Sequence, residues 1–307
     1  MREYDLVVIG GGASGLLSAI EGKKRGIENI LVIEKDPILG GALNLADYNI
    51  SKDGNLIGKQ YKEELIKEFS ELNIESQLDT MVLNINGENS TVICTSSNNG
   101  VEEIKGKNII IANGGKERGR SALNIPGSRT AGVLTIGMAK KIFGMDKMIP
   151  GKEIFIVGDD TLYMIEKDLK KHNIDVVGII TDKSKNDVFD LSKNLYSGYE
   201  VVSIKGNGRV ESIIIKNGDD EKVIECDTVI FSYPMLSDGL VALRSGIKLN
   251  PKTTGPDVNE NLKTSCDTVY ACGNAIHIHK YIEDIKEECK NLINDIVSLK
   301  DKKVTKK

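Results

Sequence analysis

The chain begins with a short, nearly continuous apolar run over residues 4–9. The glycine-rich sequence GGGASG follows at residues 10–15, and apolar residues then recur at helical spacing over residues 16–20. This order predicts a buried strand, a tight glycine turn and the start of a helix. A second apolar run, residues 29–33, ends in Glu34, from which a carboxylate can accept hydrogen bonds from ribose hydroxyls. We therefore predict a βαβ unit that binds a dinucleotide; the simpler alternative is a strand–helix turn without a ligand.

The glycines of this loop have separate roles in the prediction. Gly10 allows the tight turn, Gly12 lets a pyrophosphate approach the backbone, and Gly15 lets the helix pack close to the strand. The helix N-terminus then presents free N–H groups and a partial positive charge to the phosphates. Gly40 and Gly41, which follow Glu34, indicate either backbone pressed against a bulky ligand or an ordinary loop.

The pattern after this unit predicts more elements of an α/β fold. We expect one helix over residues 58–73, followed by three short strands that form a meander. A separate buried strand of the parallel type should then end in Asn113-Gly114-Gly115. The three meander strands are predicted over residues 79–85, 91–95 and 101–105, and the buried strand over residues 107–112.

The βαβ pattern occurs a second time, with a damaged glycine loop. The strand over residues 153–157 leads into GDDTLY at residues 158–163, a helix through Leu162, Ile165 and Leu169, and a strand over residues 175–181. The second glycine position is Asp160, whose carboxylate would face a pyrophosphate. The third is Tyr163, which would hold helix and strand apart. We expect a retained fold with weak or absent dinucleotide binding.

The remaining elements complete the second domain and then return to the first. Residues 200–226 predict a meander and residues 227–231 a short buried strand. A further strand is predicted over residues 266–272, and an amphipathic helix over residues 280–299 whose apolar stripe is core packing.

Composition restricts the class of protein. A 307-residue chain suits about two domains, and 40% hydrophobic with 28% charged residues is ordinary for a globular protein. The net charge of −4 gives no reason to expect nucleic-acid binding. No apolar stretch approaches the roughly 20 residues that span a membrane. Residues 1–3 lead directly into the first strand and leave no room for a signal peptide, so we expect a cytoplasmic protein without membrane insertion.

The five cysteines are scattered, and none forms a CxxC pair. They indicate neither a dithiol redox centre nor a zinc ribbon, and we expect reduced structural thiols. No metal site is predicted. A cluster of arginines, Arg118, Arg120 and Arg129, could hold phosphate or an acidic partner, or could belong to a solvated linker.

Taken together, these motifs resemble the pyridine nucleotide-disulfide oxidoreductase superfamily of flavoproteins. The glycine loop with Glu34, the Gly40-Gly41 pair, the strand end IIANGG at residues 110–115 and the segment VYACGN at residues 269–274 occur in the order of that superfamily's FAD contacts. The length is similar to that of its thioredoxin-reductase-sized members. Two stretches, residues 118–133 and 271–279, more narrowly resemble FAD-dependent subunits that accompany anaerobic glycerol-3-phosphate dehydrogenase and opine oxidase.

The resemblance implies an α/β fold of two Rossmann-like dinucleotide-binding domains, the second inserted into the first, each with three layers (β/β/α). Residues 1–117 would form the first part of an FAD-binding domain and residues 118–240 an NAD(P)-binding-like domain. Residues 241–307 would complete the FAD-binding domain. The residues that would contact FAD are Gly10, Gly12, Ala13, Ser14, Gly15, Glu34, Lys35, Gly41, Leu43, Val82, Ala112, Asn113, Gly114, Gly273 and Asn274. Asn274 stands where the family usually has Asp, and Asn can hydrogen-bond but brings no charge.

Two departures from the family decide the expected function. The missing CxxC excludes disulfide reductase chemistry, and the damaged second loop makes NAD(P)H use doubtful. No catalytic residue is assigned. His277 and His279 alternate with isoleucines and share one face, so they either reach the flavin edge or are structural histidines.

Three functions follow from these observations. The leading one is an FAD-dependent oxidoreductase subunit that passes electrons between its flavin and a partner dehydrogenase or small iron–sulfur protein, as a homo- or hetero-oligomer. The second is a free-standing NAD(P)H-dependent flavoprotein reductase. The third is a non-catalytic FAD-binding assembly subunit.

Overall fold

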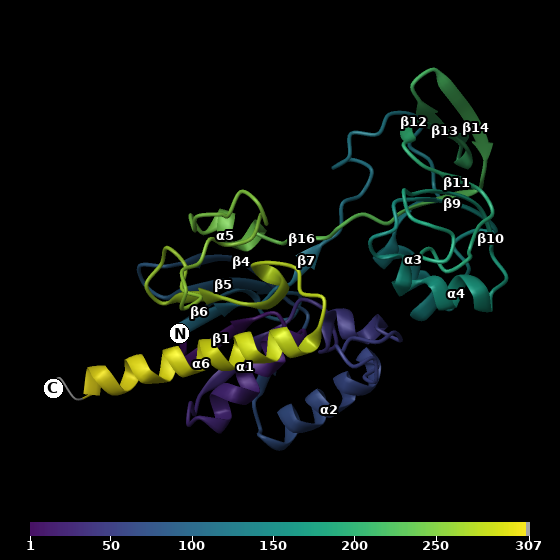
Figure 1. Ribbon diagram of the computed structural model, residues 1–307. Helices are drawn as coiled ribbons and strands as arrows, with labels where there is room; N and C mark the ends of the chain where they lie inside the picture. The colour runs from purple at the N-terminus through teal and green to yellow at the C-terminus, as the bar shows by residue number, and fades with distance from the viewer. Residues whose placement is uncertain (305–307) are drawn as a thin grey trace. The chain divides into compact units, whose positions relative to one another are not determined.

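A computed structural model describes residues 1–304 and shows two compact units (Figure 1). The first, unit 1, joins residues 1–116 to the part of the chain that begins at Leu236, and the second, unit 2, is Glu117–Met235. The chain therefore leaves the first unit, forms the second and returns. The side chains of the lysine-rich tail (Lys300, Lys302, Lys303, Lys306 and Lys307), expected to be a solvated end, lie outside what the structure describes.

Unit 1 is built on a sheet whose central strands are parallel, in the order β3-β2-β1-β6, with β17 on the other side of the C-terminal half of β6. The N-terminal half of β6 pairs instead with the antiparallel strands β5 and β4. The strands are β1 (Arg2–Ile9), β2 (Ile30–Ile33), β3 (Glu75–Gln77), β4 (Thr80–Asn86), β5 (Thr91–Ser96), β6 (Gly100–Ile111) and β17 (Val269–Ala271).

The prediction of separate strands over residues 101–105 and 107–112 is wrong, because both belong to the single strand β6. Gly106 looks like a break in the sequence, but it lies within the strand opposite Tyr4. A Cβ atom at Gly106 would lie 2.9 Å from Cγ2 of Val7. Glycine is thus needed there because β1 passes close by, and one strand serves both the parallel sheet and the meander.

The two faces of this sheet bury different partners, because side chains alternate along a strand. Leu6 and Val8 pack under the helices α1 (Ala13–Lys24), α2 (Gly58–Glu71) and α6 (Ile282–Val304), which cover one face (Figure 1). Val7 and Ile9 point to the other face and pack with residues of β4 and β5. The result is the expected β/β/α layering. The strand expected over residues 266–272 is shorter, and α6 begins two residues later than predicted.

The other elements of unit 1 are short. They are η1 (Gly41–Leu45), β7 (Gly115–Lys116), β16 (Leu236–Ser237), α5 (Leu240–Arg244) and η3 (Gly273–Ala275). β7 and β16 pair antiparallel where the chain leaves unit 1 and where it returns.

Unit 2 repeats the layering on a smaller scale. Its five-stranded parallel sheet has the order β11-β10-β9-β15-β8, and a three-stranded antiparallel sheet, β12-β13-β14, covers one face. Helices α3 and α4 cover the other face. The elements are β8 (Val133–Thr135), α3 (Ile136–Gly144), β9 (Glu153–Val157), η2 (Leu162–Met164), α4 (Glu166–Lys171), β10 (Asp175–Ile180), β11 (Leu195–Tyr196), β12 (Glu200–Asn207), β13 (Arg209–Asn217), β14 (Asp220–Glu225) and β15 (Thr228–Phe231).

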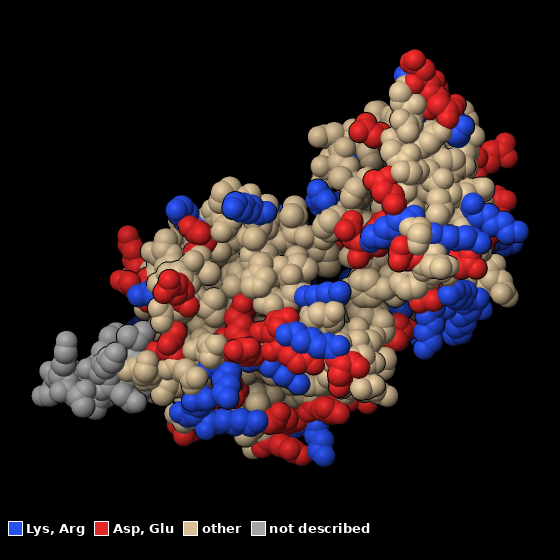
Figure 2. Space-filling model, viewed as in Figure 1, with Lys and Arg blue, Asp and Glu red and all other residues tan. Residues whose placement is uncertain are grey.

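The surface carries both signs of charge. Figure 2 shows lysine and arginine intermixed with aspartate and glutamate on the face in view, and several are paired, such as Lys52 with Asp284 at 2.5 Å. Among the described helices, none is long and apolar enough to cross a membrane.

Candidate functional site

In unit 1, the carboxyl ends of four parallel strands meet at one edge of the sheet. Ile9 at the end of β1 pairs with Ile33 of β2 and Ile111 of β6, and Ile111 pairs with Ala271 of β17. The strands next to β1 lie on opposite sides of it, β2 on one side and β6 on the other. This edge is therefore a topological switch point, which is where α/β proteins bind ligands.

The glycine loop after β1 is packed too closely for side chains at two positions. Gly10 has a left-handed backbone (φ +107°), and a Cβ atom there would lie 2.5 Å from the carbonyl oxygen of Ala112. A Cβ atom at Gly15 would lie 1.8 Å from the carbonyl oxygen of Gly10. The first and third glycines are therefore required by the fold itself.

The second glycine of the motif is different, because it has space beside it. Gly12 is the N-cap of α1, and among the described residues a Cβ atom there would meet only Cα of Gly41, at 3.9 Å. Gly41 is tighter, since its own Cβ atom would lie 2.9 Å from Cα of Gly12. The loops are held together by the bond from Gly40 N–H to the carbonyl of Gly11, 2.8 Å long. Gly12 and Gly41 thus form an open cradle at the start of α1.

The returning part of the chain closes the same cradle. Gly273, directly after β17, has φ +64°, and a Cβ atom there would lie 2.4 Å from Oγ of Ser14 in the first turn of α1. Ser14 is buried, as is Gly273. The structure therefore brings together six of the predicted residues: Gly10, Gly12, Ser14, Gly15, Gly41 and Gly273.

Glu34 is buried and binds backbone N–H groups with both carboxylate oxygens. Oε2 accepts from Gly11 N at 2.6 Å, and Oε1 accepts from Asp36 N at 2.9 Å. The carboxylate therefore lies against the glycine loop, where a ribose would be expected. Lys35 is exposed next to it.

The other predicted residues belong to unit 1, and several of them are buried. Leu43, Val82 and Ala112 are buried, and Ala13 packs against the core below α1. Nδ2 of Asn113 donates to the carbonyl of Asp238 at 3.0 Å, and its Oδ1 is buried without a hydrogen-bond partner in the described chain. Gly114 follows with φ +81°. A buried oxygen without a partner at this edge is consistent with a ligand that donates to it.

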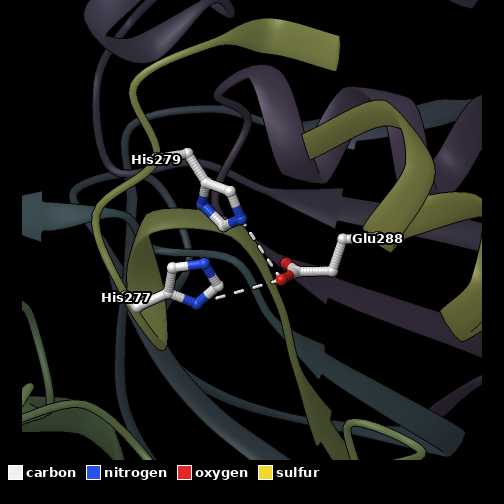
Figure 3. Close-up of side chains that lie close together, drawn as sticks. All are labelled: His277, His279 and Glu288. Carbon is white, nitrogen blue, oxygen red and sulfur yellow. Dashed lines mark ion pairs between the residues drawn. The ribbon is translucent and has the colours of Figure 1, made fainter. Parts of the chain in front are cut away.

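His277 and His279 lie side by side, and both rings face Glu288 of α6 (Figure 3). Their ring centroids are 3.9 Å apart. The Nε2 atom of His279 is 3.3 Å from Oε2 of Glu288, and Nδ1 of His277 is 4.0 Å from the same oxygen. Burial and the neighbouring His279 lower the pKa of His277.

Glu288 is a residue of this group that the sequence motifs did not indicate. The sequence gives only a weak indication of its role. Glu288 lies three residues after Ile285 and directly before Cys289, so it is a charged residue at the edge of the apolar stripe of α6. Asn274 also has a role in this group, since its Oδ1 accepts from the backbone N–H of His279 at 2.9 Å.

The second glycine loop, in unit 2, differs from the first. Gly158 keeps the left-handed backbone, with φ +86°. The next N–H groups are already used, because Asp160 N donates to the carbonyl of Ser232 and Thr161 N to Oγ of Ser232, each at 3.1 Å. These donors would otherwise face a pyrophosphate.

The helix that should follow this loop is also broken. The prediction of one helix through Leu162, Ile165 and Leu169 is wrong: residues 162–164 form a 3-10 turn, and α4 begins only at Glu166 and has six residues. Asp159 pairs with Lys183 and accepts from the hydroxyl of Thr181, and burial together with Asp159 raises the pKa of Asp160.

Two residues of the arginine cluster, Arg118 and Arg120, donate to different carbonyl groups. Arg118 donates to the carbonyl of Pro234 at 3.3 Å and lies over the ring of Tyr233. Arg120 donates to the carbonyl of Ile125 at 2.9 Å and so fixes the turn that follows it. All three contacts lie within unit 2.

The five cysteines are free thiols, and four of them are buried. Burial raises the pKa of Cys94, and raises that of Cys226 to about 12. The neighbouring Cys289 thiol and burial raise the pKa of Cys272. Thiols held in the protonated form are poor nucleophiles.

Comparison with known proteins agrees with this architecture. The chain is 26% identical to a ferredoxin–NADP reductase of Sulfurisphaera tokodaii over 89% of this chain and 85% of that protein. It is 22% identical to a ferredoxin–NADP reductase of Malacoplasma penetrans over 91% of this chain and 90% of that protein. The fold is that of T. acidophilum thioredoxin reductase, with a TM-score of 0.79, 17% identity and coverage of 97% of this chain and 99% of that one.

The model of one family, the pyridine nucleotide-disulphide oxidoreductases, matches residues 4–159, which includes the whole first glycine loop, Glu34 and β6. Members of this family bind FAD and use NAD(P)H. The chain belongs to the pyridine nucleotide-disulphide oxidoreductase family and is a flavoprotein oxidoreductase of that general kind.

Proposed function

We propose that the chain binds FAD in the cradle of unit 1 and passes electrons between this flavin and a partner dehydrogenase or small iron–sulfur protein. FAD, when bound, supplies the redox chemistry, and the chain supplies binding and electrostatics. The narrower proposal is that it is a subunit of the kind that accompanies anaerobic glycerol-3-phosphate dehydrogenase or opine oxidase.

The fit to FAD rests on the space at Gly12. Residues around it are packed at distances that exclude side chains, yet Gly12 itself faces an open position at the N-terminus of a twelve-residue helix. Such a terminus offers unpaired N–H groups to a pyrophosphate. Gly10, Gly12, Ala13, Ser14, Gly15, Gly41, Gly273 and Asn274 would hold the phosphates and ribityl chain, Glu34 and Lys35 the adenosine end, and Leu43, Val82, Ala112, Asn113 and Gly114 would line the rest of the site.

The difference between the glycine loop of unit 1 and that of unit 2 supports the proposal that a partner supplies the electrons. Around Gly158 the N–H groups are bonded to Ser232, and the helix start that would face a pyrophosphate is interrupted. Asp160 adds a carboxylate where phosphate charge would lie. This arrangement supports weak or absent NAD(P)H binding, and the absence of CxxC with raised pKa values of the buried thiols supports the exclusion of dithiol–disulfide chemistry.

A second candidate is a free-standing NAD(P)H-dependent flavoprotein reductase. It is favoured by the two ferredoxin–NADP reductases that match almost the whole chain. It requires that unit 2 bind the nicotinamide cofactor despite the bonds from its loop to Ser232.

An anaerobic spectrum of the FAD-loaded chain, recorded before and after addition of NADH or NADPH, separates these functions. We expect the yellow flavin to stay oxidised with either nucleotide and to be reduced by dithionite. Rapid bleaching by NADH or NADPH would establish the second candidate instead. A flavin that dithionite reduces but no candidate protein partner oxidises would indicate a non-catalytic assembly subunit.

A loop variant locates the cause of weak nucleotide binding. The double variant Asp160→Gly/Ser232→Ala removes the carboxylate and frees the N–H of Thr161, so we expect NADH binding to become stronger than in the wild type. Ser237→Ala, in unit 1, is the control for loss of a buried serine hydroxyl. Equal NADH binding by wild type and double variant would show that this loop is not what limits it.

A further inference from the structure

The group formed by His277, His279 and Glu288 has no role in the proposed electron transfer. His279 and Glu288 are almost fully enclosed, with side-chain exposures of 4% and 13%, whereas the His277 side chain is 51% exposed. The three ligand atoms, one from each residue, lie within 4.8 Å of one another. One side of the group therefore faces solvent and the other is fixed inside unit 1.

The hydrogen bonds of Asn274 determine which nitrogen of His279 carries the proton. The Asn274 oxygen accepts from the backbone N–H of His279 at 2.9 Å, so this atom is an acceptor and not the amide nitrogen. The same oxygen lies 3.3 Å from Nδ1 of His279. Because an amide oxygen carries no hydrogen, Nδ1 is the donor in that contact.

The neutral His279 ring then has its lone pair on Nε2, and that lone pair faces the carboxylate. Oε2 of Glu288 is 3.3 Å away, and the other oxygen, Oε1, is held by the backbone N–H of Gly273. Two acceptors this close repel each other unless a cation lies between them. A proton is one cation that can lie there and a metal ion is another, and Nδ1 of His277, 4.0 Å from the same oxygen, offers a metal ion a third ligand atom.

We propose that His277, His279 and Glu288 bind a divalent transition-metal ion of the zinc class, with at least one coordination position open to solvent. Two imidazoles and one carboxylate are a ligand set that suits zinc, whereas magnesium and calcium prefer oxygen ligands alone. Ligand atoms of a tetrahedral zinc ion lie about 3.3 Å apart, given bonds of about 2.0–2.1 Å. The His279–Glu288 distance already has this value, and only the exposed His277 ring needs to move.

The contacts behind the ligands support the same site. Asn274 orients His279 through Nδ1, and the Gly273 N–H orients Glu288 through Oε1. Metal-binding histidines and carboxylates are commonly fixed in this way by the atom that does not bind the metal. Both supports come from the turn after β17, so the site is connected to the FAD cradle but does not depend on a bound flavin.

Equilibrium dialysis against Zn²⁺, followed by metal analysis, tests the proposal on the full chain without a polyhistidine tag. We expect about one Zn²⁺ per chain, and at least ~10-fold weaker binding in His279→Ala and in Glu288→Gln. Glu288→Gln keeps an oxygen for the Gly273 N–H, so it tests the charged ligand with the fold preserved. Glu287→Gln, one residue away and exposed, and His172→Ala, in unit 2, are the matched controls.

Substitution of Co²⁺ for Zn²⁺ gives a second readout, since its visible spectrum should show nitrogen ligation in the wild type and lose it in His279→Ala. Wild-type zinc binding that is unchanged in both ligand variants, or absent altogether, would overturn the proposal. So would nitrogen NMR showing a doubly protonated His279 that Zn²⁺ does not displace. Flavin absorbance, recorded in the same samples, reports FAD binding separately.

Discussion

Gly15 packs directly against the carbonyl group of Gly10, which leaves 1.8 Å for a Cβ atom where van der Waals contact needs about twice that distance. The contact lets α1 begin immediately after β1. It also makes the third glycine of the loop a requirement of the folded chain, whether or not a ligand is bound.

Gly15→Ala should therefore destabilise the protein before any cofactor is considered. Forcing one methyl group into this contact should lower the free energy of unfolding by about 1–3 kcal/mol or more, since neither backbone segment can move without disturbing β1 or α1. Denaturant unfolding of the FAD-free protein measures this. Gly119→Ala is the control, because its Cβ atom would meet only a methyl group of Thr135, at 3.7 Å. Equal stability of both variants would contradict the packing argument.

Gly12→Ala should separate cofactor binding from folding. A Cβ atom at Gly12 has room in the structure, so the FAD-free variant should lose no more than about 1 kcal/mol of stability. The same methyl group would occupy the space proposed for the pyrophosphate, and we expect FAD affinity to fall at least tenfold. Flavin titration followed by fluorescence measures the affinity. An unchanged affinity would place the phosphates elsewhere.

Glu34→Gln should affect both stability and cofactor binding. The carboxylate accepts from two backbone N–H groups, Gly11 N and Asp36 N, and a glutamine amide can accept from only one of them. The other would face an NH₂ group, at a cost of about 1–3 kcal/mol. Thermal unfolding of the FAD-free variant and its FAD affinity should both decrease. Glu28→Gln, at an exposed position before β2, is the control.

The sequence was most informative where local spacing decides the structure. One backbone path is required by the spacing of Gly10, Gly12 and Gly15 before an apolar helix, with Glu34 at the end of the next strand. The βαβ unit and the sheet edge that it forms could therefore be predicted. β6 was divided wrongly because Gly106 has the local appearance of a turn. Only the packing of Val7 against it shows why glycine stands within a strand.

Tertiary contacts explain what could not be predicted. The use of the second loop's N–H groups by Ser232 depends on β15 lying beside β9, and these strands are far apart in the sequence. Glu288 reaches the histidines because the turn after β17 folds back onto α6. No spacing within the segment containing His277 and His279 encodes that approach.

Asp160 should make the stability of the protein depend on pH. Although Asp160 is exposed, partial desolvation and the neighbouring Asp159 raise its pKa in the folded state above the ordinary 3.8, so the folded protein binds this proton more tightly than the unfolded chain. The ionised carboxylate therefore destabilises the fold at neutral pH, and this penalty disappears as the pH falls below about 3.8. Asp160→Asn should raise Tm at pH 7, and the difference from wild type should shrink towards acid pH. Asp219→Asn, exposed in the hairpin before β14, controls for the loss of one charge.

Lys140 and Asp168 form a buried ion pair in unit 2. Lys140 is fully buried, and its Nζ lies 2.5 Å from Oδ2 of Asp168, which joins α3 to α4. Lys140→Met should destabilise unit 2 by about 3–5 kcal/mol, because it leaves a carboxylate in the interior without this cation. The double variant Lys140→Met/Asp168→Leu removes both charges and should recover much of that loss. Urea unfolding measures each variant, with the exposed Lys141→Met as control. A double variant no more stable than the single one would show that helix packing, and not the unpaired charge, sets the cost.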